Sequence, residues 1–559
     1  MIEERSGGRI LVDALCLHGT SHVFCVPGES YLPVLDALLD AQSIRTVVCR
    51  QEGGAAMMAD AYGKLTRRPG ICLVTRGPGA TNAAAGVHIA AQDSTPLILL
   101  IGQVARDAAG REAFQEVDFR LMFGSLAKRV EQIEDPSRIP EVISRAFHTA
   151  TNGRAGPVVV ALPEDMLTEC ARVGDTAPYQ QIEPSPSGLE LEELERLLRT
   201  AQRPLVIIGG HGWHLEAREA FHRFASLWDL PVAAAFRYQD SFDNSGEQYV
   251  GDIGIGINPK LKTAVHDADL ILAICVRLGE VTTSGYTIID LPTPSQRLVH
   301  VYPGMEELGS VYRADLAINA GPNRFTDAVQ KIEAPPALPW SKWRRQLRDD
   351  YLAWSEPRPQ PGTVQLGEII CALRAELPQD TVVTNGAGNY TAWLHRHHRY
   401  CAPGSQLAPT SGSMGYGLPA AIAAKLLQPH RTAIAFSGDG CFLMTGQELA
   451  TAVQYELSLV VILVNNAMYG TIRMHQEKRY PGRISGTDLV NPDFCKLAVA
   501  FGAHAERVTE TKEFIPALRR AVVNDGPTLI ELMVDPDAIS PNQTLAEIRA
   551  AATSNIANT

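Results

Sequence analysis

The chain has 559 residues, 45% of them hydrophobic and 20% charged, which is ordinary globular usage and excludes disordered and fibrous proteins. The 50 Lys and Arg against 62 Asp and Glu give a net charge of −12, which argues against nucleic acid or an anionic membrane as a partner. At roughly 150 residues per domain, this length predicts three or four domains.

In chain order, short apolar β-branched runs alternate with helical stretches, a pattern typical of parallel α/β sheets. We predict three doubly wound, mostly parallel-sheet domains. In the first, strands are expected at 46–49, 71–74, 97–101 and 158–161, and helices at 32–40, 54–65 and 80–91. Further strands are expected at 205–208, 270–273 and 298–301, and then at 381–384, 432–436, 459–464 and 528–532. The first and third groups share their order of elements, which suggests a duplicated fold.

Two proline-rich stretches with few apolar residues, 171–188 and 333–362, are predicted to be linkers. They separate expected domains at 1–170, 189–332 and 363–540, followed by a C-terminal tail at 541–559. Three tryptophans in the second stretch indicate that it packs on a surface. The histidine-rich run 395–398 is predicted to be exposed.

Nothing in the sequence predicts a membrane span or a secretion signal. The longest apolar runs, 97–101 and 457–464, are too short to cross a bilayer, and the N-terminus M-I-E-E-R precedes no apolar stretch. The ten cysteines include no C-x-x-C pair, which is typical of reduced thiols. We therefore expect a cytoplasmic protein.

The segment 433–476 carries the clearest chemistry. A buried strand runs into Gly438-Asp439-Gly440, a helix follows, and the next strand ends at Asn465-Asn466. Neighbouring parallel strands end at the same edge of a sheet, so Asp439 and Asn466 should converge there. Their oxygens suit Mg²⁺, and the two glycines leave room for phosphate groups beside the backbone. The alternative is an ordinary turn at a strand end.

A G-D-G motif followed after about 25 residues by N-N resembles the thiamine diphosphate motif. Over nearly its whole length the chain resembles the acetohydroxyacid (acetolactate) synthase-like family, which is related to 2-oxo-acid decarboxylases. The resemblance implies pyrimidine-binding, central and diphosphate-binding domains in that order. It also implies that Asp439, Asn466 and the main-chain carbonyl of Met468 hold the metal. The cofactor contacts implied in the third domain are Gly388, Asn389, Tyr390, Gly412, Met414, Gly438, Asp439, Gly440, Cys441, Asn466, Met468, Tyr469 and Gly470.

Two further motifs resemble parts of the family's catalytic machinery. In R-Q-E-G-G-A (50–55), the resemblance implies that Glu52 hydrogen-bonds the aminopyrimidine ring and moves protons through it. On the residues alone, Glu52 could instead be a charge that favours a helix N-terminus. In T-S-G-S-M-G-Y-G-L-P (410–419), Met414 corresponds to the bulky residue that bends the cofactor and makes proton transfer intramolecular. Its alternative is a core methionine.

Other matches concern the substrate. The segments R-G-P-G-A-T-N (76–82) and G-Q-V (102–104) resemble family segments, as does A-F-Q-E (113–116), whose Phe114 and Gln115 would face the reacting carbon. Gly28 and Glu29 lie where related enzymes contact the substrate, but acetohydroxyacid synthases have a second glycine in place of Glu29. Glu29 could donate a proton or favour a cationic or hydroxylated substrate, or it could be a solvent-facing carboxylate at a helix start.

Two departures bear on the reaction. His475 stands where acetohydroxyacid synthases have a tryptophan that shapes the second-substrate pocket; it could titrate near neutrality or have no task. Arg277, in V-R-L-G-E (276–280), resembles the arginine that meets the second substrate, beside residues that line a flavin in the family. The sequence departs from the family after Arg277, and the glycine turn at 207–212 is not a full dinucleotide fingerprint. Both features argue against bound FAD, but they do not exclude it.

The resemblance implies a thiamine diphosphate- and Mg²⁺-dependent carboligase acting on a 2-oxo acid and a carbonyl acceptor. It also implies a homodimer or a dimer of dimers, with active sites at the subunit interface. A non-ligating 2-oxo-acid decarboxylase or an acyloin lyase is the nearest alternative. A flavin- or nicotinamide-dependent oxidoreductase and a non-catalytic regulatory homologue are more distant ones.

Overall fold

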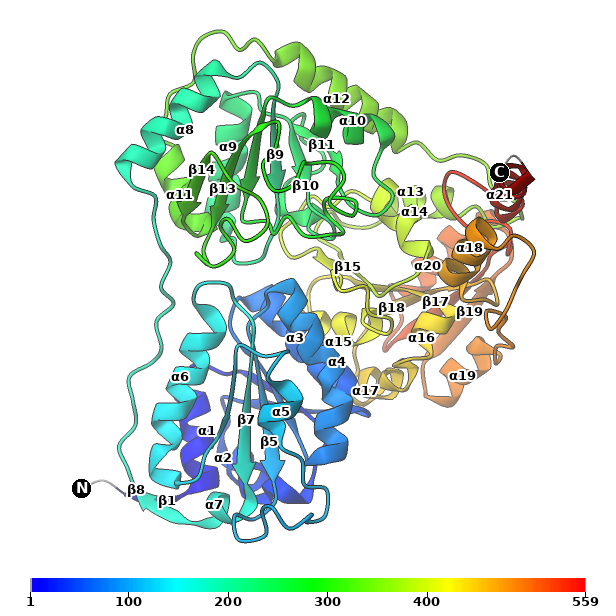
Figure 1. The fold of residues 1–559 in the computed structure, drawn as a ribbon. Helices are drawn as coiled ribbons and strands as arrows, with labels where there is room; N and C mark the ends of the chain where they lie inside the picture. The colour runs from blue at the N-terminus through cyan, green and yellow to red at the C-terminus, as the bar shows by residue number, and fades with distance from the viewer. Residues whose placement is uncertain (1–2, 558–559) are drawn as a thin grey trace.

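The computed structural model describes residues 3–557 and consists of three α/β domains, each built on a six-stranded sheet (Figure 1). All strand pairs within these three sheets are parallel, which confirms the predicted fold class. Residues 1, 2, 558 and 559, the ends of the expected first domain and tail, lie outside the described residues. Between residues 3 and 557, no helix combines the length and the apolar character that a membrane span needs.

The first domain has the strand order β3-β2-β4-β5-β7-β6. Its strands are β2 (His22–Cys25), β3 (Arg45–Val48), β4 (Gly70–Val74), β5 (Leu97–Gln103), β6 (Arg129–Gln132) and β7 (Pro157–Pro163). Its helices are α1 (Gly7–Leu17), α2 (Leu32–Asp40), α3 (Glu52–Thr66), α4 (Gly77–Asp93), α5 (Phe119–Phe123), α6 (Ile139–Thr151) and α7 (Glu164–Thr168). Two short strands, β1 (Glu4–Ser6) and β8 (Cys170–Arg172), pair antiparallel beside this sheet. The central strands β4, β5 and β7 are buried along their length because helices cover both faces.

The middle domain has the order β11-β10-β9-β12-β13-β14. Its strands are β9 (Pro204–Ile208), β10 (Val232–Ala234), β11 (Tyr249–Asp252), β12 (Leu270–Ile274), β13 (Arg297–Tyr302) and β14 (Leu316–Asn319). Its helices are α8 (Gly188–Thr200), α9 (Leu215–Leu227), α10 (Pro259–Asp267), α11 (Pro322–Val329) and α12 (Ser341–Trp354). Numbered along the chain, this order is 3-2-1-4-5-6, the arrangement of dinucleotide-binding sheets.

The third domain has the order β16-β15-β17-β18-β20-β19. Its strands are β15 (Val382–Asn385), β16 (Gln406–Leu407), β17 (Ala433–Gly438), β18 (Val460–Asn465), β19 (His504–Val508) and β20 (Thr528–Met533). Its helices are α13 (Leu366–Glu376), α14 (Tyr390–His397), α15 (Gly417–Leu427), α16 (Asp439–Phe442), α17 (Leu449–Gln454), α18 (Gly470–Arg479), α19 (Phe494–Ala500), α20 (Phe514–Ala521) and α21 (Leu545–Ala557). Numbered along the chain, the first and third sheets both have the order 2-1-3-4-6-5, so the duplicated fold is present in the topology.

The first and third domains share one hydrophobic core. Helix α3 packs against both α4 and α15, and one cluster of buried side chains includes residues of all three helices. Small residues allow the close approach: a Cβ on Gly86 of α4 would lie 2.3 Å from the Cβ of Ala56 on α3. The start of α3 is thereby fixed relative to the third sheet.

The two expected linkers differ in structure. Residues 173–187 contain neither helix nor strand, whereas the second stretch contains α12, which lies across the middle domain (Figure 1). Trp340 stacks on Trp228 with 6.5 Å between ring centroids, and Arg344 Nε lies 2.7 Å from Asp229 Oδ1. The predicted packing of this stretch on a surface is therefore confirmed.

The prediction that residues 395–398 are exposed is wrong. His395, Arg396, His397 and His398 are all buried, at 2–7% exposure, where α14 meets the middle domain and α12. Gln239 Nε2 of the middle domain donates to the His395 carbonyl at 2.8 Å, and Arg396 Nε donates to the Trp354 carbonyl at 2.7 Å. Polar composition suggested a solvated face, but this helix lies between domains. Burial lowers the pKa of His395 and of His398 to about 3.

Candidate active site

Candidate site residues follow strands at the carboxyl edges of the first and third sheets. In both sheets the strand order reverses between the first and third strand, and ligands of open α/β sheets bind at such reversals. In the third sheet these strands are β15 and β17, followed by Gly386 and Asp439. In the first sheet they are β2 and β4, followed by Glu29 and Arg76, and Glu52 follows the adjacent β3.

The predicted metal ligands lie at the ends of adjacent strands. Gly438 pairs with Val464 in the ladder between β17 and β18, which places Asp439 beside the Asn465-Asn466 end. Asp439 is 3% exposed, and burial raises the pKa of its carboxyl. Asn466 is half-buried, and the Met468 carbonyl accepts from the Gly470 N–H at 2.9 Å; a carbonyl oxygen has a second lone pair to offer a metal. Carboxylate, amide and carbonyl oxygens of this kind fit Mg²⁺.

Glycines and two tyrosines surround this strand edge. A Cβ on Gly438 would lie 3.1 Å from the Tyr390 ring, and one on Gly440 would lie 2.6 Å from the Tyr469 ring. Tyr390 Oη donates to Cys441 Sγ at 3.4 Å. The structure thus brings Gly388, Tyr390, Gly438, Gly440, Cys441 and Tyr469 to one place, beside Gly470 and Asn466. Glycine at these positions keeps the backbone free of a side chain of its own, which is what close approach of a diphosphate to main-chain N–H groups requires.

The side-chain amide of Asn389 is hydrogen-bonded within the chain at both its nitrogen and its oxygen. Its Nδ2 donates to the Ile539 carbonyl at 2.9 Å, and its Oδ1 accepts from Thr471 Oγ1 at 2.8 Å. The side chain therefore ties α14 to α18 and to the segment after β20. A cofactor would meet its backbone more readily than its amide.

The loop that carries Met414 lies beside the same strand edge. Gly415 N–H donates to Cys441 Sγ at 3.2 Å, and Thr445 Oγ1 donates to the Gly415 carbonyl at 2.6 Å. Met414 is half-buried against the core of the third domain. Gly412 has φ +69°, the left-handed region that favours glycine, and open space around it. The loop is therefore placed to present Met414 to a ligand of the glycine-rich edge.

Glu52 is the first residue of α3 and is half-buried. Its Oε2 accepts from Asn82 Nδ2 at 2.9 Å. The buried carboxylate of Glu448, from the third domain, accepts from the Gln51 N–H at 2.9 Å and the Arg50 N–H at 3.1 Å. Sequence reasoning identified neither supporting residue. Asn82 lies within the quoted G-P-G-A-T-N motif, but Glu448 has no local signal because it is 398 residues away from Arg50.

Glu29 lies on the surface of the first domain. Its side chain is 68% exposed and lies 3.2 Å from Arg76 Nη1, and Arg76 also pairs with Glu164. Arg76 itself is almost fully buried, at 8% side-chain exposure. The preceding Gly28 is tightly packed, since a Cβ there would lie 2.5 Å from the Thr75 Cβ.

The other predicted substrate residues are largely exposed. Phe114 is 73% exposed, and Gln115 has φ +65° with its carbonyl accepting from the Gly77 N–H at 2.9 Å. His475 is exposed on α18, where partial burial and the charges of Lys478 and Arg479 lower its pKa.

The first-domain and third-domain residues form two separate groups. Within residues 3–557, no hydrogen bond or ion pair joins Glu52, Glu29 or Gln115 to the three predicted metal ligands.

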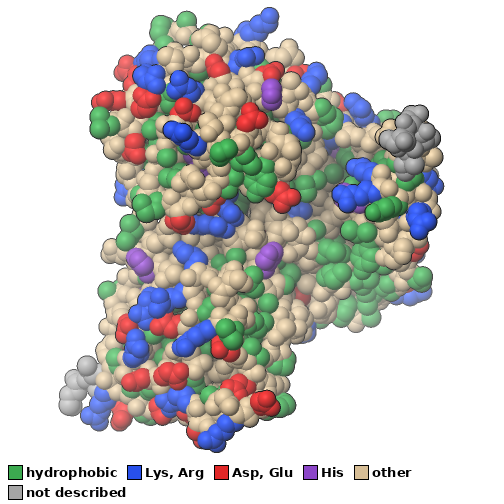
Figure 2. Space-filling model, in the orientation of Figure 1, with side chains coloured by type: hydrophobic (Ala, Val, Ile, Leu, Met, Phe, Trp, Pro, Cys, Tyr) green, Lys and Arg blue, Asp and Glu red, His purple; other side chains and the backbone are tan. Residues whose placement is uncertain are grey.

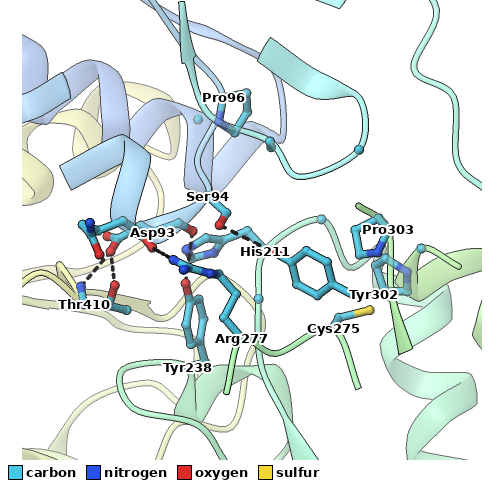
Figure 3. A pocket seen from close by; sticks show the side chains of 18 of the residues that line it. Asp93, Ser94, Pro96, His211, Tyr238, Cys275, Arg277, Tyr302, Pro303 and Thr410 are labelled. Atoms are coloured by element: carbon cyan, nitrogen blue, oxygen red, sulfur yellow. Dashed lines mark hydrogen bonds between the residues drawn. The ribbon is translucent and has the colours of Figure 1, made fainter. Parts of the chain in front are cut away.

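Arg277 lies elsewhere, in a cavity of about 510 Å³ between the first and middle domains (Figure 3). Its Nε lies 3.1 Å from Glu307 Oε2, and its Nη1 donates to the Gln92 carbonyl at 3.4 Å. The cavity opens at the ends of β9 and β12, where the order of the middle sheet reverses. That position and volume suit a nucleotide-sized ligand. The structure does not bring Arg277 to the predicted metal ligands.

Three models of thiamine pyrophosphate enzymes match the chain: the N-terminal TPP binding domain at residues 5–122, the central domain at 191–329 and the C-terminal TPP binding domain at 386–532. The chain is 32% identical to the acetolactate synthase large subunit of Parasynechococcus marenigrum, over 95% of this chain and 87% of that protein. It is 30% identical to the acetolactate synthase isozyme 2 large subunit of Escherichia coli, over 95% of this chain and 96% of that protein. It is also 30% identical to the probable acetolactate synthase large subunit of Methanocaldococcus jannaschii, over 96% and 93% respectively.

Proposed function

Because the chain belongs to the thiamine pyrophosphate enzymes of the acetolactate synthase-like group, we propose that it is an Mg²⁺-dependent carboligase of 2-oxo acids. It would decarboxylate one 2-oxo acid and join the remaining carbons to a carbonyl acceptor. The observation that supports this most is the convergence of Asp439, Asn466 and the Met468 carbonyl beside the glycines that follow β17.

When bound, thiamine diphosphate supplies the nucleophilic carbon and the electron sink that this decarboxylation requires. Asp439, Asn466 and Met468 would hold the magnesium ion, while Gly438 and Gly440 admit the diphosphate to the backbone. Glu52, oriented by Asn82, would hold and return a proton at the aminopyrimidine ring. These residues would orient the cofactor and transfer its proton, and the surrounding domains would exclude water from the site.

We further propose that two chains are needed for one site, in a homodimer or a dimer of dimers. Among residues 3–557, no hydrogen bond or ion pair joins Glu52 to Asp439, Asn466 or Met468, and apolar side chains are exposed on both domains. Figure 2 shows hydrophobic side chains gathered on the third domain where Figure 1 has α16. Leu443 and Met444 are about half exposed, at 45% and 46%, and Val490 is fully exposed at 104%. A partner's first domain, with Phe114, would cover them.

The nearest alternative is a non-ligating 2-oxo-acid decarboxylase or an acyloin lyase. His475 supports it because it stands, exposed, where the synthases have a tryptophan. The sequence argues against FAD but leaves it open, and the cavity at Arg277 lies where a nucleotide would bind; a yellow colour of the purified protein would reveal a flavin. We expect the protein in the cytoplasm, in keeping with the free state of its cysteines among the described residues.

The test is CO₂ release from a panel of 2-oxo acids, with and without thiamine diphosphate and Mg²⁺, with mass spectrometry of the products. A cofactor-dependent coupled product would support the carboligase, and free aldehyde alone would favour the decarboxylase. Glu52→Gln should lower the rate by roughly 10²–10⁴-fold, as expected for loss of a general acid–base group. Glu141→Gln, on the exposed face of α6, is the matched control and should leave the rate unchanged. Absence of cofactor binding would refute the proposal.

A further inference from the structure

Four charged side chains are buried together where the three domains meet. Asp60 and Lys64 lie one turn apart on α3, Asp93 ends α4, and Arg237 comes from the middle domain. Lys64 Nζ lies 2.9 Å from Asp60 Oδ2 and 2.5 Å from Asp93 Oδ2, with side chains at most 1% exposed. Burial opposes the charge on Lys64, but the two carboxylates outweigh it and raise its pKa.

Arg237 lies in the same buried region. It is 4% exposed, and none of the carboxylates described in residues 3–557 comes within ion-pair distance of it. Burial lowers the pKa of its guanidinium. An unpaired buried charge is costly, so the carbonyl of Pro409, which accepts from Arg237 Nη1, matters for holding this side chain.

All four side chains contact one segment of the third domain, residues 408–416, which carries Met414. Lys64 Nζ donates to the Ala408 carbonyl at 3.3 Å and to Tyr416 Oη at 3.2 Å, and Arg237 Nη1 donates to the Pro409 carbonyl. Asp93 Oδ1 accepts from the Thr410 N–H at 2.8 Å and from Thr410 Oγ1. Asp60 Oδ2 accepts from Tyr416 Oη at 2.6 Å. Figure 3 shows the bonds between Asp93 and Thr410, with Tyr238 of the middle domain approaching from the other side. Tyr238 Oη donates to the Asp93 carbonyl at 3.1 Å.

These contacts hold the loop at both ends. Residues 408–410 are bound at one end and Tyr416 at the other, while between them the side chains of Ser411 and Ser413 bond each other at 3.2 Å. Buried ion pairs add little stability compared with apolar packing, so they are better suited to fixing one geometry than to strengthening the fold.

We propose that Asp60, Lys64, Asp93 and Arg237 form a positioning cluster that sets the conformation of the Met414 loop, and with it the conformation in which the cofactor is bound. The claim that the cluster sets the conformation of the bound cofactor rests on the proposed function, whereas the claim that it anchors the loop does not. The same helix that carries Asp60 and Lys64 begins at Glu52, about 12 Å away from Asp60 at 1.5 Å per residue. One rigid helix thus fixes both the proton-transfer group and the base of the loop.

The experiment uses the full chain and two gentle variants, Asp93→Asn and Tyr416→Phe, because removing Lys64 would leave two carboxylates uncompensated and risk misfolding. Each has a matched control. Asp229→Asn weakens the Asp229–Arg344 pair of the middle domain, and Tyr455→Phe removes a tyrosine hydroxyl that accepts from the Val48 N–H at 2.7 Å. The first readout is amide hydrogen exchange of residues 408–417 without cofactor. We expect at least ten-fold faster exchange in the two variants and wild-type rates in both controls.

The second readout is the exchange rate of the reactive C2 proton of bound thiamine diphosphate, which reports the cofactor's conformation. We expect it to fall at least ten-fold in Asp93→Asn and Tyr416→Phe, with a cofactor Kd within about three-fold of wild type. Unchanged amide exchange at 408–417, or equal changes in the controls, would overturn the anchoring. A loosened loop with an unchanged C2 exchange rate would overturn the positioning role. Failure of the wild-type protein to bind the cofactor would refute the proposed function, while the amide readout would still decide the anchoring.

Discussion

Asp439 is oriented by neutral donors, and no cation among residues 3–557 forms an ion pair with it. Its Oδ2 accepts from Asn491 Nδ2 at 2.8 Å and its Oδ1 accepts from the Gly440 N–H at 2.8 Å. The same Asn491 Nδ2 lies 3.0 Å from Asn465 Oδ1, and Asn465 Nδ2 donates to the buried Glu531 at 2.7 Å. A cation at this place would compete with a metal ion for the carboxylate charge, whereas an amide fixes the carboxylate and leaves its charge available.

We therefore expect Asn491→Ala to weaken Mg²⁺ binding in the presence of thiamine diphosphate by roughly 10–100-fold, the usual effect of losing a group that orients a metal ligand. Magnesium titration of cofactor binding would measure it. Asn524→Ala, which removes another half-buried amide of the third domain, should leave the magnesium affinity unchanged. Equal affinities for wild type and Asn491→Ala would show that Asp439 needs no such support.

Residues of the candidate site could be predicted where a local motif contains them. Asp439, Asn466, Glu52 and Met414 stand in short segments whose spacing indicates their chemistry. The residues that orient them come from distant parts of the chain, such as Glu448 for the start of α3, and carry no motif of their own. Physical support of a site depends on tertiary contacts, which local sequence does not encode.

Among the elements, the central strands were predictable and the edge strands were not. Buried parallel strands such as β5 and β18 are continuous apolar runs, so their positions agree with the prediction to within two residues. Edge strands carry polar side chains: β6 is R-V-E-Q and β19 is H-A-E-R-V. Of the six edge strands of the three sheets, only β3 was predicted. The short inner strands β2 and β10 were also missed.

Helix α21, within the predicted tail, is joined to α18 by one ion pair and a small apolar cluster. Arg549 Nε and Nη2 donate to the two oxygens of Glu477 at 2.9 and 2.6 Å, and the Glu477 side chain is fully buried. Leu545 and Ile548 pack with Met468, which precedes α18. The tail helix therefore supports the segment that offers the Met468 carbonyl.

Removing the arginine should loosen this pair of helices. We expect Arg549→Ala to leave the Glu477 carboxylate with the Gly482 N–H alone and to destabilise α18 and α21 locally by about 1–3 kcal/mol. Hydrogen exchange of amides in 470–479 and 545–555 would measure this. Arg519→Ala, which breaks an ion pair whose arginine is 65% exposed, should have a much smaller effect because solvent screens that pair. Equal effects of the two variants would contradict a special role for the buried carboxylate.

At the scale of the whole molecule, the buried histidines predict loss of stability in acid. Burial lowers the pKa of His395 and His398 to about 3 and that of His397 to about 4. The unfolded chain, with histidine pKa near 6.5, therefore binds more protons below that pH, and stability falls as the pH decreases. Each histidine contributes a loss of roughly 1.4 kcal/mol per pH unit below 6.5. Asp252, with its pKa raised by burial to about 7, offsets part of this.

Calorimetry between pH 7.5 and 5 would measure this effect. We expect the unfolding temperature to be highest near neutrality and to decrease steadily below pH 6.5. High salt, which screens surface charges, should leave the decrease in place because the groups involved are buried. An unfolding temperature that stays constant or rises towards pH 5 would show that these histidines are protonated in the folded protein.

The proposed sharing of each active site between two subunits predicts complementation between inactive subunits. A chain with Glu52→Gln lacks the first-domain half, and a chain with Asp439→Asn lacks the third-domain half. In a mixed dimer, one of the two sites would combine the intact Asp439 of the first chain with the intact Glu52 of the second. We expect unfolded and co-refolded mixtures, or co-expressed chains, to recover activity that neither variant has alone. No recovery in a dimer shown to contain both chains would place each complete site within one chain.

The shared core of α3, α4 and α15 has a consequence for how the protein is made. Lys64 and its carbonyl partner at Ala408 are 344 residues apart. At about 5–20 residues per second, roughly 20–70 s pass between their synthesis on the ribosome. During that interval the alanine- and glycine-rich face of α3 has no α15 to cover it. The first domain therefore waits, with part of its core exposed, for a helix of the domain that is translated last.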